Sequence, residues 1–383
     1  MPDTVSPVPP ARPTRIDEID WLRGVAVALM ILAHGFDAWL LPSAKTGLAY
    51  EAIRLLSGIP SRLFLFLVGI SAAIQFETQM ARGLSTSTMR SRLLRRGLQI
   101  LVLAYLFRLQ EWILSNFWGG WQSLVRIDIL NAIGASMIVL ALLTTPRGGR
   151  RQIGAALAGA ALFLGLGTVV GPAHFPAWLP APLTSYLGGQ RPIAWFPLFP
   201  WGAWSLTGVA VGHIWFQAAR QPGGLRRALL FSGLVGLVLT AGVMLARALA
   251  PNLIHYPSAV VFQMGPGVFF HRLGLIGVLA AVAHLWCGAL GNRFSVMRQL
   301  GRTSLFIYWI HIELCYGNVA ASLKAQLHIP AATLGIVLLT ALMLGVSVLK
   351  TRYGRTLFTE LRRWLSALRT RSSRVVADRL SSD

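Results

Sequence analysis

Ten apolar segments of about twenty residues run through this chain, separated by short polar loops. A helix needs about 20 apolar residues to cross the hydrocarbon core of a bilayer, where every backbone polar group must be satisfied internally. Charged residues make up only 13% of the 383 residues, about half the fraction that is usual in soluble domains. The sequence therefore predicts an all-α, polytopic transmembrane helix bundle with spans at 22–42, 62–78, 96–115, 127–145, 152–170, 197–216, 226–249, 265–288, 303–319 and 331–349.

The Lys and Arg residues alternate between the two sides of this bundle. The loops predicted on one side, together with both chain ends, hold 25 basic residues, whereas the five opposite loops hold four: Lys45, Arg54, Arg191 and Lys324. Cytoplasmic loops of membrane proteins carry such an excess, so the alternation predicts that both termini are cytoplasmic. Topology and anionic lipid account for the net charge of +22 without a nucleic acid partner.

Three regions follow from this layout. Residues 1–20 form a cytoplasmic N-terminal segment that lacks the features of a cleaved signal peptide, and residues 21–349 form the transmembrane domain. Residues 350–383 place apolar side chains at helical spacing among arginines, which predicts an amphipathic helix on the cytoplasmic membrane surface. Both cysteines lie in apolar spans and the histidines lack metal-ligand spacing, so we predict neither a disulfide nor a bound metal.

The first apolar segment carries two polar residues eleven positions apart, Arg23 and His34. At about 100° per residue, eleven steps return to nearly the same helix face, about 16 Å further along the axis. One membrane helix would thus hold a fixed cation near the cytoplasmic surface and a proton-transfer group near its centre. A titratable group at that depth is costly to bury, which favours a chemical role for His34 over a purely structural one.

Further ionisable and polar residues concentrate in the outer halves of five spans. Each needs a partner or water in the hydrocarbon region, so together they predict a polar cavity that opens to the outer side. Structural alternatives remain open: Arg108 and Glu111 are spaced as an ion pair, Asp128 is placed to cap a helix, and outer-loop tryptophans suit a membrane-interface belt. The residues are Asp37, Arg108, Glu111, Arg126, Asp128, Asn131, His271, Arg272, His311 and Glu313.

A second candidate site lies on the cytoplasmic side, where Gly301-Arg302-Thr303-Ser304 opens the ninth span. The free amides and the dipole of a helix N-terminus favour phosphate, and an arginine beside them adds charge. Ser and Thr are also ordinary helix caps, so the pattern alone is weak evidence for a phosphate site. The prediction of a phosphate site depends mainly on Arg23, which is expected at the same membrane face.

Several motifs in this chain resemble those of membrane acyltransferases. The run from Arg15 to Gly24, with the basic residue and the ten-residue spacer before His34, resembles the opening of acyltransferase family 3. Other motifs are similar to the heparan-α-glucosaminide N-acetyltransferase-like bacterial proteins, although no histidine occurs in 43–61, where those enzymes have one, and Asn131 stands where they often have Gln. These motifs are Leu63–Ser71, Asp128–Gly134, Phe196–Trp201, His255–Ser258 and Leu300–Tyr308.

The resemblance implies a multi-pass protein of the bacterial cytoplasmic membrane that moves an acyl group, usually acetyl from cytoplasmic acetyl-CoA, onto a glycan at the far side. Arg23, Arg302, Thr303 and Ser304 would then hold the CoA phosphates. His34 would act as general base or, as the alternative, carry the acetyl group, and Asp37 or Asp128 would orient its imidazole. Tyr308, His311 or Arg272 would stabilise the oxyanion, and the remaining acceptor contacts would come from Arg108, Glu111, Asn131, His271 and Tyr256.

A different function also fits a polar cavity that is open to one side. A transporter or flippase of a lipid-linked or small glycan would need such a cavity, although the chain shows no strong internal repeat. Glycine and alanine are plentiful in the fifth and seventh spans, which would permit close helix contact within one chain or between the two chains of a homodimer.

Overall fold

The computed structural model describes residues 16–117, 120–143, 149–169, 175–176, 178–189, 193–250 and 265–380, and beyond residue 354 it describes the helix but few side chains. Thirteen α-helices make up most of these residues. The described part contains no strand, only isolated bridges that join Leu40 to Leu327 and Ile127 to Ala194. The expected all-α bundle is confirmed.

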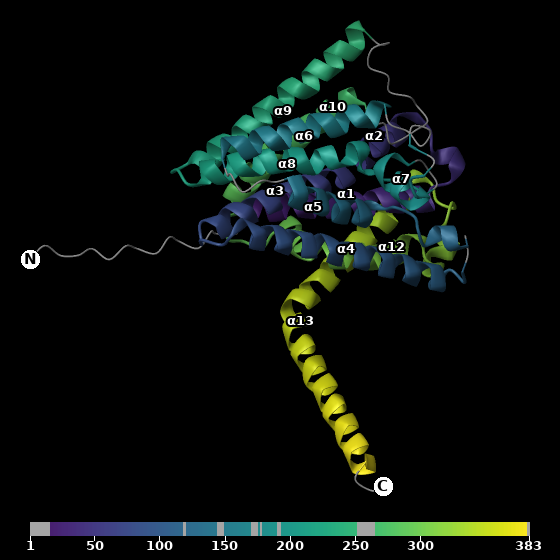
Figure 1. Cartoon of the computed structure of the whole chain (residues 1–383). Helices are drawn as coiled ribbons and strands as arrows, with labels where there is room; N and C mark the ends of the chain where they lie inside the picture. The colour runs from purple at the N-terminus through teal and green to yellow at the C-terminus, as the bar shows by residue number, and fades with distance from the viewer. Residues whose placement is uncertain are drawn as a thin grey trace, which may run out of the picture.

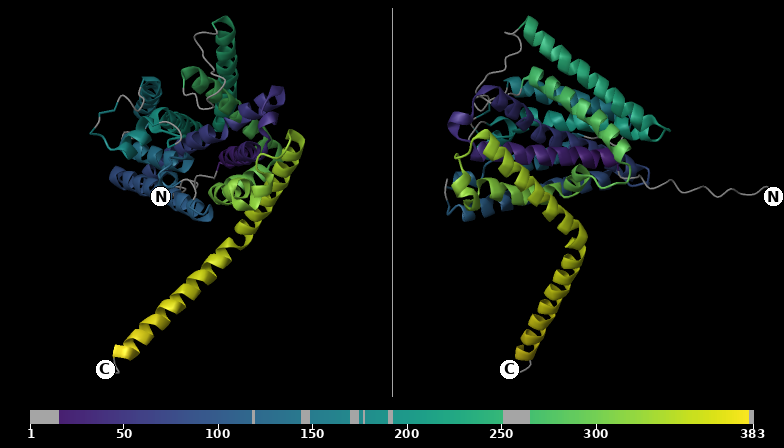
Figure 2. Two further views of the ribbon diagram at one scale, coloured as in Figure 1. Left: turned by 90° about the vertical axis from the view of Figure 1, so that its right-hand side faces the viewer. Right: turned by 180° about the vertical axis from the view of Figure 1, so that it is seen from behind.

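The long helices run side by side, and α1 (Asp17–Trp39) passes through the middle of the bundle (Figures 1 and 2). On one side of α1, α3 (Pro60–Met80) packs against α8 (Leu198–Ala219). On the other side lie α11 (Val296–Arg302), α12 (Ser304–Tyr316) and α13 (Ile329–Leu380). The remaining helices are α2 (Gly47–Ser57), α4 (Thr86–Leu114), α5 (Ile129–Leu143), α6 (Arg150–Val169), α7 (Ala181–Gly188), α9 (Gly224–Leu249) and α10 (Pro266–Leu290).

Seven described helical stretches are long and apolar enough to cross a membrane, and α5 adds a shorter apolar helix. The protein is therefore a multi-pass membrane protein. The expected sixth span corresponds to α8, where Phe199 lies between two prolines and has non-helical backbone angles in the first turn. The count of ten spans and the orientation of the bundle remain predictions.

The ninth expected span, 303–319, forms the short helix α12 (Ser304–Tyr316). A further short helix, α11 (Val296–Arg302), precedes it in a segment that we expected to be a loop, and Thr303, whose φ of −120° and ψ of 17° are not helical, separates the two. The 13 residues of α12 span about 20 Å, which is less than the hydrocarbon thickness. The break places the buried Thr303 and the half-buried Ser304 at the N-terminus of α12.

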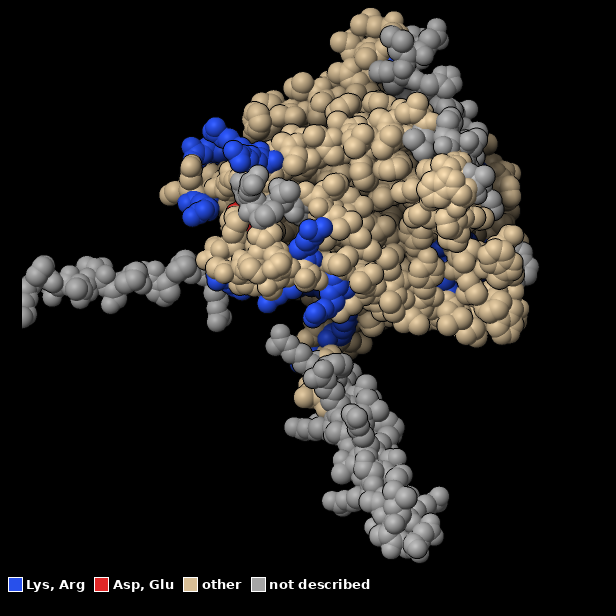
Figure 3. Space-filling model, viewed as in Figure 1, with Lys and Arg blue, Asp and Glu red and all other residues tan. Residues whose placement is uncertain are grey.

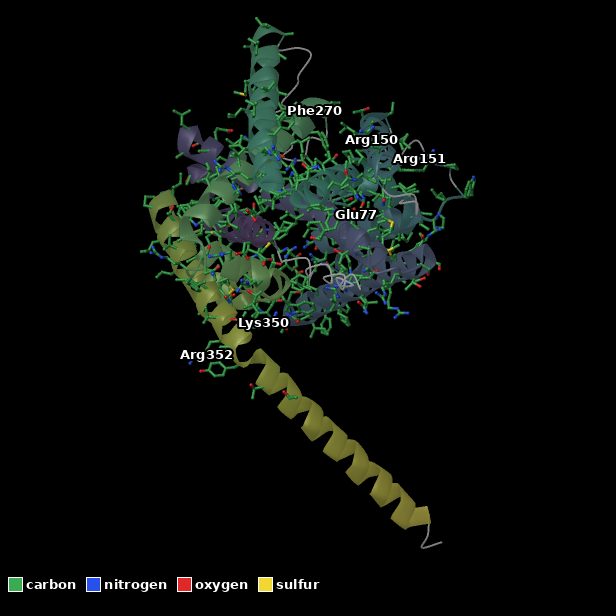
Figure 4. All side chains as sticks on the ribbon, turned by 90° about the vertical axis from the view of Figure 1, so that its left-hand side faces the viewer. Glu77, Arg150, Arg151, Phe270, Lys350 and Arg352 are labelled. Atoms are coloured by element: carbon green, nitrogen blue, oxygen red, sulfur yellow. The ribbon has the colours of Figure 1, made fainter. Side chains whose placement is uncertain are left out.

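The last helix, α13 (Ile329–Leu380), turns away from the bundle near Lys350 and Arg352 (Figure 4). It is continuous through the expected boundary at residue 350, and most side chains of the expected amphipathic tail lie outside the described residues. Among the described residues, Lys and Arg gather at one end of the bundle and beside the first part of α13 (Figure 3). This uneven distribution matches the charge asymmetry of the loops.

One buried polar pair joins α3 and α8. His213 on α8 is fully buried, and its Nδ1 atom lies 2.7 Å from a carboxylate oxygen of Glu77 on α3. Glu77 lies in the interior when the bundle is viewed along its helices (Figure 4). A Cβ on Gly69 of α3 would collide with the carbonyl of Ser205 on α8, so glycine allows the two backbones to approach closely enough to form this contact.

Candidate active site

Two histidines from opposite ends of the chain form a hydrogen-bonded pair. Nδ1 of His34, on α1, lies 2.9 Å from Nε2 of His311, on α12. The two rings are nearly parallel, with centroids 5.2 Å apart and planes inclined by 14°. His311 is fully buried, whereas His34 is half-buried and lines a cavity. His311 therefore lies behind His34 as seen from the cavity.

The cavity in front of His34, here called the histidine cavity, has a volume of about 400 Å³. Helices α1, α3, α4, α5 and α12 contribute to its wall. Its polar lining consists of His34, Asp37, Ser57, Ser61, Arg108, Glu111, Arg126 and Asp128, and its aromatic lining consists of Phe64, Phe107, Trp195, Phe196, Tyr308 and Tyr316. A mixture of aromatic faces and polar groups of this kind suits a carbohydrate-sized ligand.

Four of the five Asp, Glu and Arg residues that line the histidine cavity neutralise one another. Arg108 is 6% exposed, donates to Glu111 at 2.6 Å and forms an ion pair with Asp128. Arg126 lies 3.5 Å from Asp128 and 3.8 Å from Glu111. The ion pair expected from the spacing of Arg108 and Glu111 thus forms as part of a four-residue network. Such a network leaves little net charge for a ligand to balance.

Asp37 has a different neighbour from the one that we expected. The Tyr316 hydroxyl donates to its Oδ2 atom at 2.7 Å, and the Tyr316 ring meets the His34 ring edge-on at 5.7 Å. Among the described residues, neither Asp37 nor Asp128 bonds to His34. The partner of His34 Nδ1 in the structure is instead His311, and a catalytic role for Asp37 or Asp128 stays a prediction.

A second cavity, here called the basic cavity, has a volume of about 420 Å³. Four cations line it, and no Asp or Glu is found among the described lining residues. Thr303 and Ser304 at the α12 N-terminus also contribute, and Asp20 lies beneath two of the cations, 3.2 Å from Arg23 and 3.9 Å from Arg302. The four cations are Arg23, Arg96, Arg302 and Lys350.

Close backbone contact between α1 and α11 brings Arg23 and Arg302 to the same cavity. A Cβ on Gly24 would collide with the carbonyl of Met297, and a Cβ on Gly301 would collide with the carbonyl of Asp20. Glycine is the residue that tolerates this approach. The glycine after Arg23 and the glycine before Arg302 therefore allow the two helix backbones to approach, which brings the two arginines to one cavity.

The two cavities meet. Phe64, Ile129 and Tyr308 line both of them, so these three side chains form the boundary between the basic cavity and the histidine cavity. Tyr308 is 7% exposed, and its ring lies 5.8 Å from the ring of His311. Helix α1 carries Arg23 in one cavity and His34 in the other.

The structure separates the expected acceptor residues into two groups. Arg108, Glu111 and Tyr308 line the histidine cavity, together with Asp128, which was expected to orient the catalytic histidine. Neither His271 nor Arg272 is among the lining residues of either cavity, and Arg272 donates to the carbonyl of Leu55. Tyr256 lies outside the described residues.

Asn131 supports the wall without entering the cavity. Its Oδ1 atom accepts from the Asp128 amide at 3.1 Å, and its Nδ2 atom donates to the Tyr186 hydroxyl at 3.0 Å. Tyr186 lies on α7, outside the membrane-spanning helices, and bonds to Tyr105 at 2.6 Å. Burial, followed by the Tyr105 bond, raises the pKa of Tyr186, so the phenol remains neutral.

Sequence reasoning did not find several lining residues. Arg96 and Lys350 were counted only as topology-determining charges, and the available signal was their position at the expected cytoplasmic ends of the spans 96–115 and 331–349. Tyr316 and Phe64 lie in apolar segments that are equally typical of a hydrophobic core, so nothing in the sequence distinguishes them as lining residues. Trp195 is one of the outer-loop tryptophans, for which a membrane-interface belt was the favoured interpretation.

A family model for the catalytic domain of heparan-alpha-glucosaminide N-acetyltransferase matches residues 15–255, more than half of the chain. No curated protein matches the chain. The matched segment extends from α1 to α9 and includes Arg23 and His34, whereas Arg302, Tyr308 and His311 follow it. The chain therefore belongs to the heparan-alpha-glucosaminide N-acetyltransferase catalytic family, a family of membrane acetyltransferases.

Proposed function

We propose that this protein transfers an acetyl group from acetyl-CoA, held in the basic cavity, to a glycan hydroxyl or amine in the histidine cavity. The observation that carries the proposal is the meeting of the two cavities at Phe64, Ile129 and Tyr308. A cationic compartment and a compartment with a proton-transfer group share one wall, as a reaction between a phosphate-bearing donor and a sugar requires. Family membership supports acetyl as the group that is transferred.

The basic cavity suits the phosphates of CoA. Four cations without a carboxylate in the described lining, together with the α12 N-terminus at Ser304, favour a polyanion. Arg23 and His34 are about 16 Å apart along α1, a distance that an extended pantetheine arm can cover. The excess of basic residues in the loops expected at this end supports a cytoplasmic location for the donor and a bacterial cytoplasmic membrane for the protein.

The chemical step follows from the position of His34. Nε2 of His34 accepts the proton of the acceptor O–H or N–H group as the acceptor oxygen or nitrogen forms a bond to the thioester carbonyl carbon. The carbon–sulfur bond then breaks, and the proton passes from His34 to the departing CoA sulfur. Tyr308 lies at the boundary of the two cavities, where its hydroxyl is available to stabilise the oxyanion of the tetrahedral intermediate.

The histidine cavity suits an uncharged glycan at the extracytoplasmic face. The aromatic side chains Trp195, Phe196 and Tyr316 offer stacking surfaces for sugar rings. The carboxylates of Asp37 and Glu111 are hydrogen-bond acceptors for hydroxyl or amine groups. Modification of a cell-envelope glycan is the function that these contacts support best.

Binding of the donor is tested by thermal unfolding of the purified, full-length protein. A ligand that binds only the native state, present at 100 times its Kd, stabilises that state by about 2.7 kcal/mol. We expect acetyl-CoA and CoA to raise the melting temperature. Acetate and pantetheine, neither of which carries a phosphate, should leave it unchanged. No stabilisation by acetyl-CoA, combined with uptake of a glycan into vesicles, would replace the proposal with a transporter.

Catalysis is tested by the substitution His34→Ala, with His328→Ala as the matched control on an exposed loop. General-base catalysis contributes about 10²- to 10⁴-fold to a rate, so we expect His34→Ala to reduce acetyl transfer to a candidate glycan by at least that factor. Stabilisation by acetyl-CoA should persist, because His34 does not line the basic cavity. Near-normal transfer by His34→Ala would exclude His34 as the base.

A further inference from the structure

The hydrogen bonds of His311 determine where the protons of both histidines lie. Nδ1 of His311 is 2.9 Å from the carbonyl oxygen of Ile307, and a carbonyl oxygen only accepts. The proton of the neutral His311 ring is therefore on Nδ1, and its Nε2 atom is an acceptor. Because that Nε2 atom is paired with Nδ1 of His34, the His34 proton must lie on Nδ1. Nε2 of His34 then has a free lone pair.

The geometry of α12 fixes this arrangement. Ile307 and His311 are one helical turn apart, so the carbonyl that receives the side-chain bond is part of the rigid helix backbone. Both residues are fully buried, which excludes water as a competing partner. The rings of Tyr308 and His34 lie 5.8 Å and 5.2 Å from that of His311 and restrict its rotation.

We propose that His311 is a positioning residue that sets the tautomer of His34, the role that a carboxylate has in a Ser-His-Asp triad. This inference rests on the proposed function, because it assigns His34 Nε2 as the base. It differs from the expectation that His311 stabilises the oxyanion, since both ring nitrogens of His311 are already engaged. A backbone carbonyl, a neutral imidazole and the catalytic imidazole form one chain of donors and acceptors.

Two variants separate tautomer control from packing. His311→Gln keeps an acceptor at the position of Nε2, because the glutamine amide reaches as far as that atom, whereas His311→Phe fills the same volume without an acceptor. We expect His311→Phe to reduce kcat by about 10²- to 10³-fold with little change in KM for either substrate, because loss of the correct tautomer costs about 10⁴-fold where it has been isolated. His311→Gln should recover to within about tenfold of the unmodified protein.

A double-mutant cycle tests whether His311 acts through His34. In a His34→Ala background, His311→Phe should cause no further loss, since the group that it positions is absent. Equal losses for His311→Gln and His311→Phe, or a full additional loss in the His34→Ala background, would overturn the proposal. Normal transfer by His34→Ala would instead refute the proposed function itself.

The tautomer has a direct spectroscopic signature that does not depend on turnover. In the full-length protein labelled with ¹⁵N-histidine, the His34 ring should show a protonated Nδ1 and an unprotonated Nε2, assigned by loss of the signals in His34→Ala. This measurement decides the matter if His311→Phe does not fold. A His34 ring that is protonated on Nε2 would disprove the role of His311.

Discussion

The two cavities are alike in volume but opposite in the way they treat charge. The basic cavity holds four cations that no carboxylate in the described lining opposes, and only Asp20 lies beneath two of them. The histidine cavity holds three carboxylates and two arginines, and four of these five residues neutralise one another. The cations of the basic cavity outnumber the one carboxylate beside them and therefore favour an anionic ligand, whereas the closed network of the histidine cavity favours an uncharged one. The contrast supports the proposed placement of donor and acceptor.

The largest expected effect concerns the closed network. Arg108→Leu removes a buried cation and leaves the carboxylates of Glu111 and Asp128 with only Arg126 as a partner. Loss of one member of a buried pair costs about 3–5 kcal/mol, so we expect a decrease of that size in the free energy of unfolding in mixed detergent. The matched variant Arg96→Leu, at an exposed cation of the basic cavity, should change it by less than about 0.5 kcal/mol. Equal decreases in the free energy of unfolding for the two variants would contradict the proposed difference between the cavities.

Donor affinity should respond only to the cations of the basic cavity. Arg302→Gln removes a charged hydrogen bond worth about 1.5–3 kcal/mol, which raises the Kd for acetyl-CoA by about 10- to 100-fold. Arg126→Gln, which removes a cation of the histidine cavity, should leave that Kd within about twofold. Titration calorimetry of both variants measures the difference. If Arg126→Gln alone raised the Kd for acetyl-CoA, the donor would have to bind in the histidine cavity and not in the basic cavity.

Two serines provide a finer comparison. Nη2 of Arg23 donates to Oγ of Ser71 at 3.2 Å, and Ser71 lines the basic cavity, whereas Ser61 lines the histidine cavity. Ser71→Ala loosens the arginine by about one hydrogen bond, near 1 kcal/mol, so the Kd for acetyl-CoA should rise about fivefold. Ser61→Ala should not affect it. A reversed order of effects in calorimetry would show that the donor occupies the other cavity.

Ionic strength should produce the smallest effect. The Debye length falls as salt rises, so an increase from 50 to 200 mM salt should weaken acetyl-CoA binding by about twofold. Binding of an uncharged glycan in the histidine cavity should not change. The two KM values, measured over the same salt series, test this difference. A salt-dependent acceptor KM would mean that the acceptor itself is charged.

Depth in the membrane could be predicted from the sequence, but direction around each helix axis could not. Hydrophobic segments and basic loops place a residue along the membrane normal, and on this basis His271, Arg272 and Asp128 were expected at similar depth. Only Asp128 faces the histidine cavity, while Arg272 bonds to the carbonyl of Leu55 at the end of α2. The orientation of a helix depends on packing with partners that are distant in the chain.

The site shows the same limit. Arg23 and His34 could be found because their relation depends on the geometry of a single helix. The pairing of His34 with His311 joins residues 277 positions apart and depends on the position of α12. The short helices α2 and α11 were assigned to loops, because 11 and 7 residues are too short to produce a strong apolar period.

Helix α1 carries Arg23 and His34 on a single rigid element, and this has a consequence for the choice of donor. Because both residues lie on one continuous helix, the distance between them is fixed. A molecule that lacks either the phosphates or an arm of the right length cannot contact Arg23 and reach His34 at the same time. Acetyl-pantetheine should therefore be a far poorer donor than acetyl-CoA at equal concentration. Comparable rates for the two would show that the fixed distance between Arg23 and His34 does not select the donor.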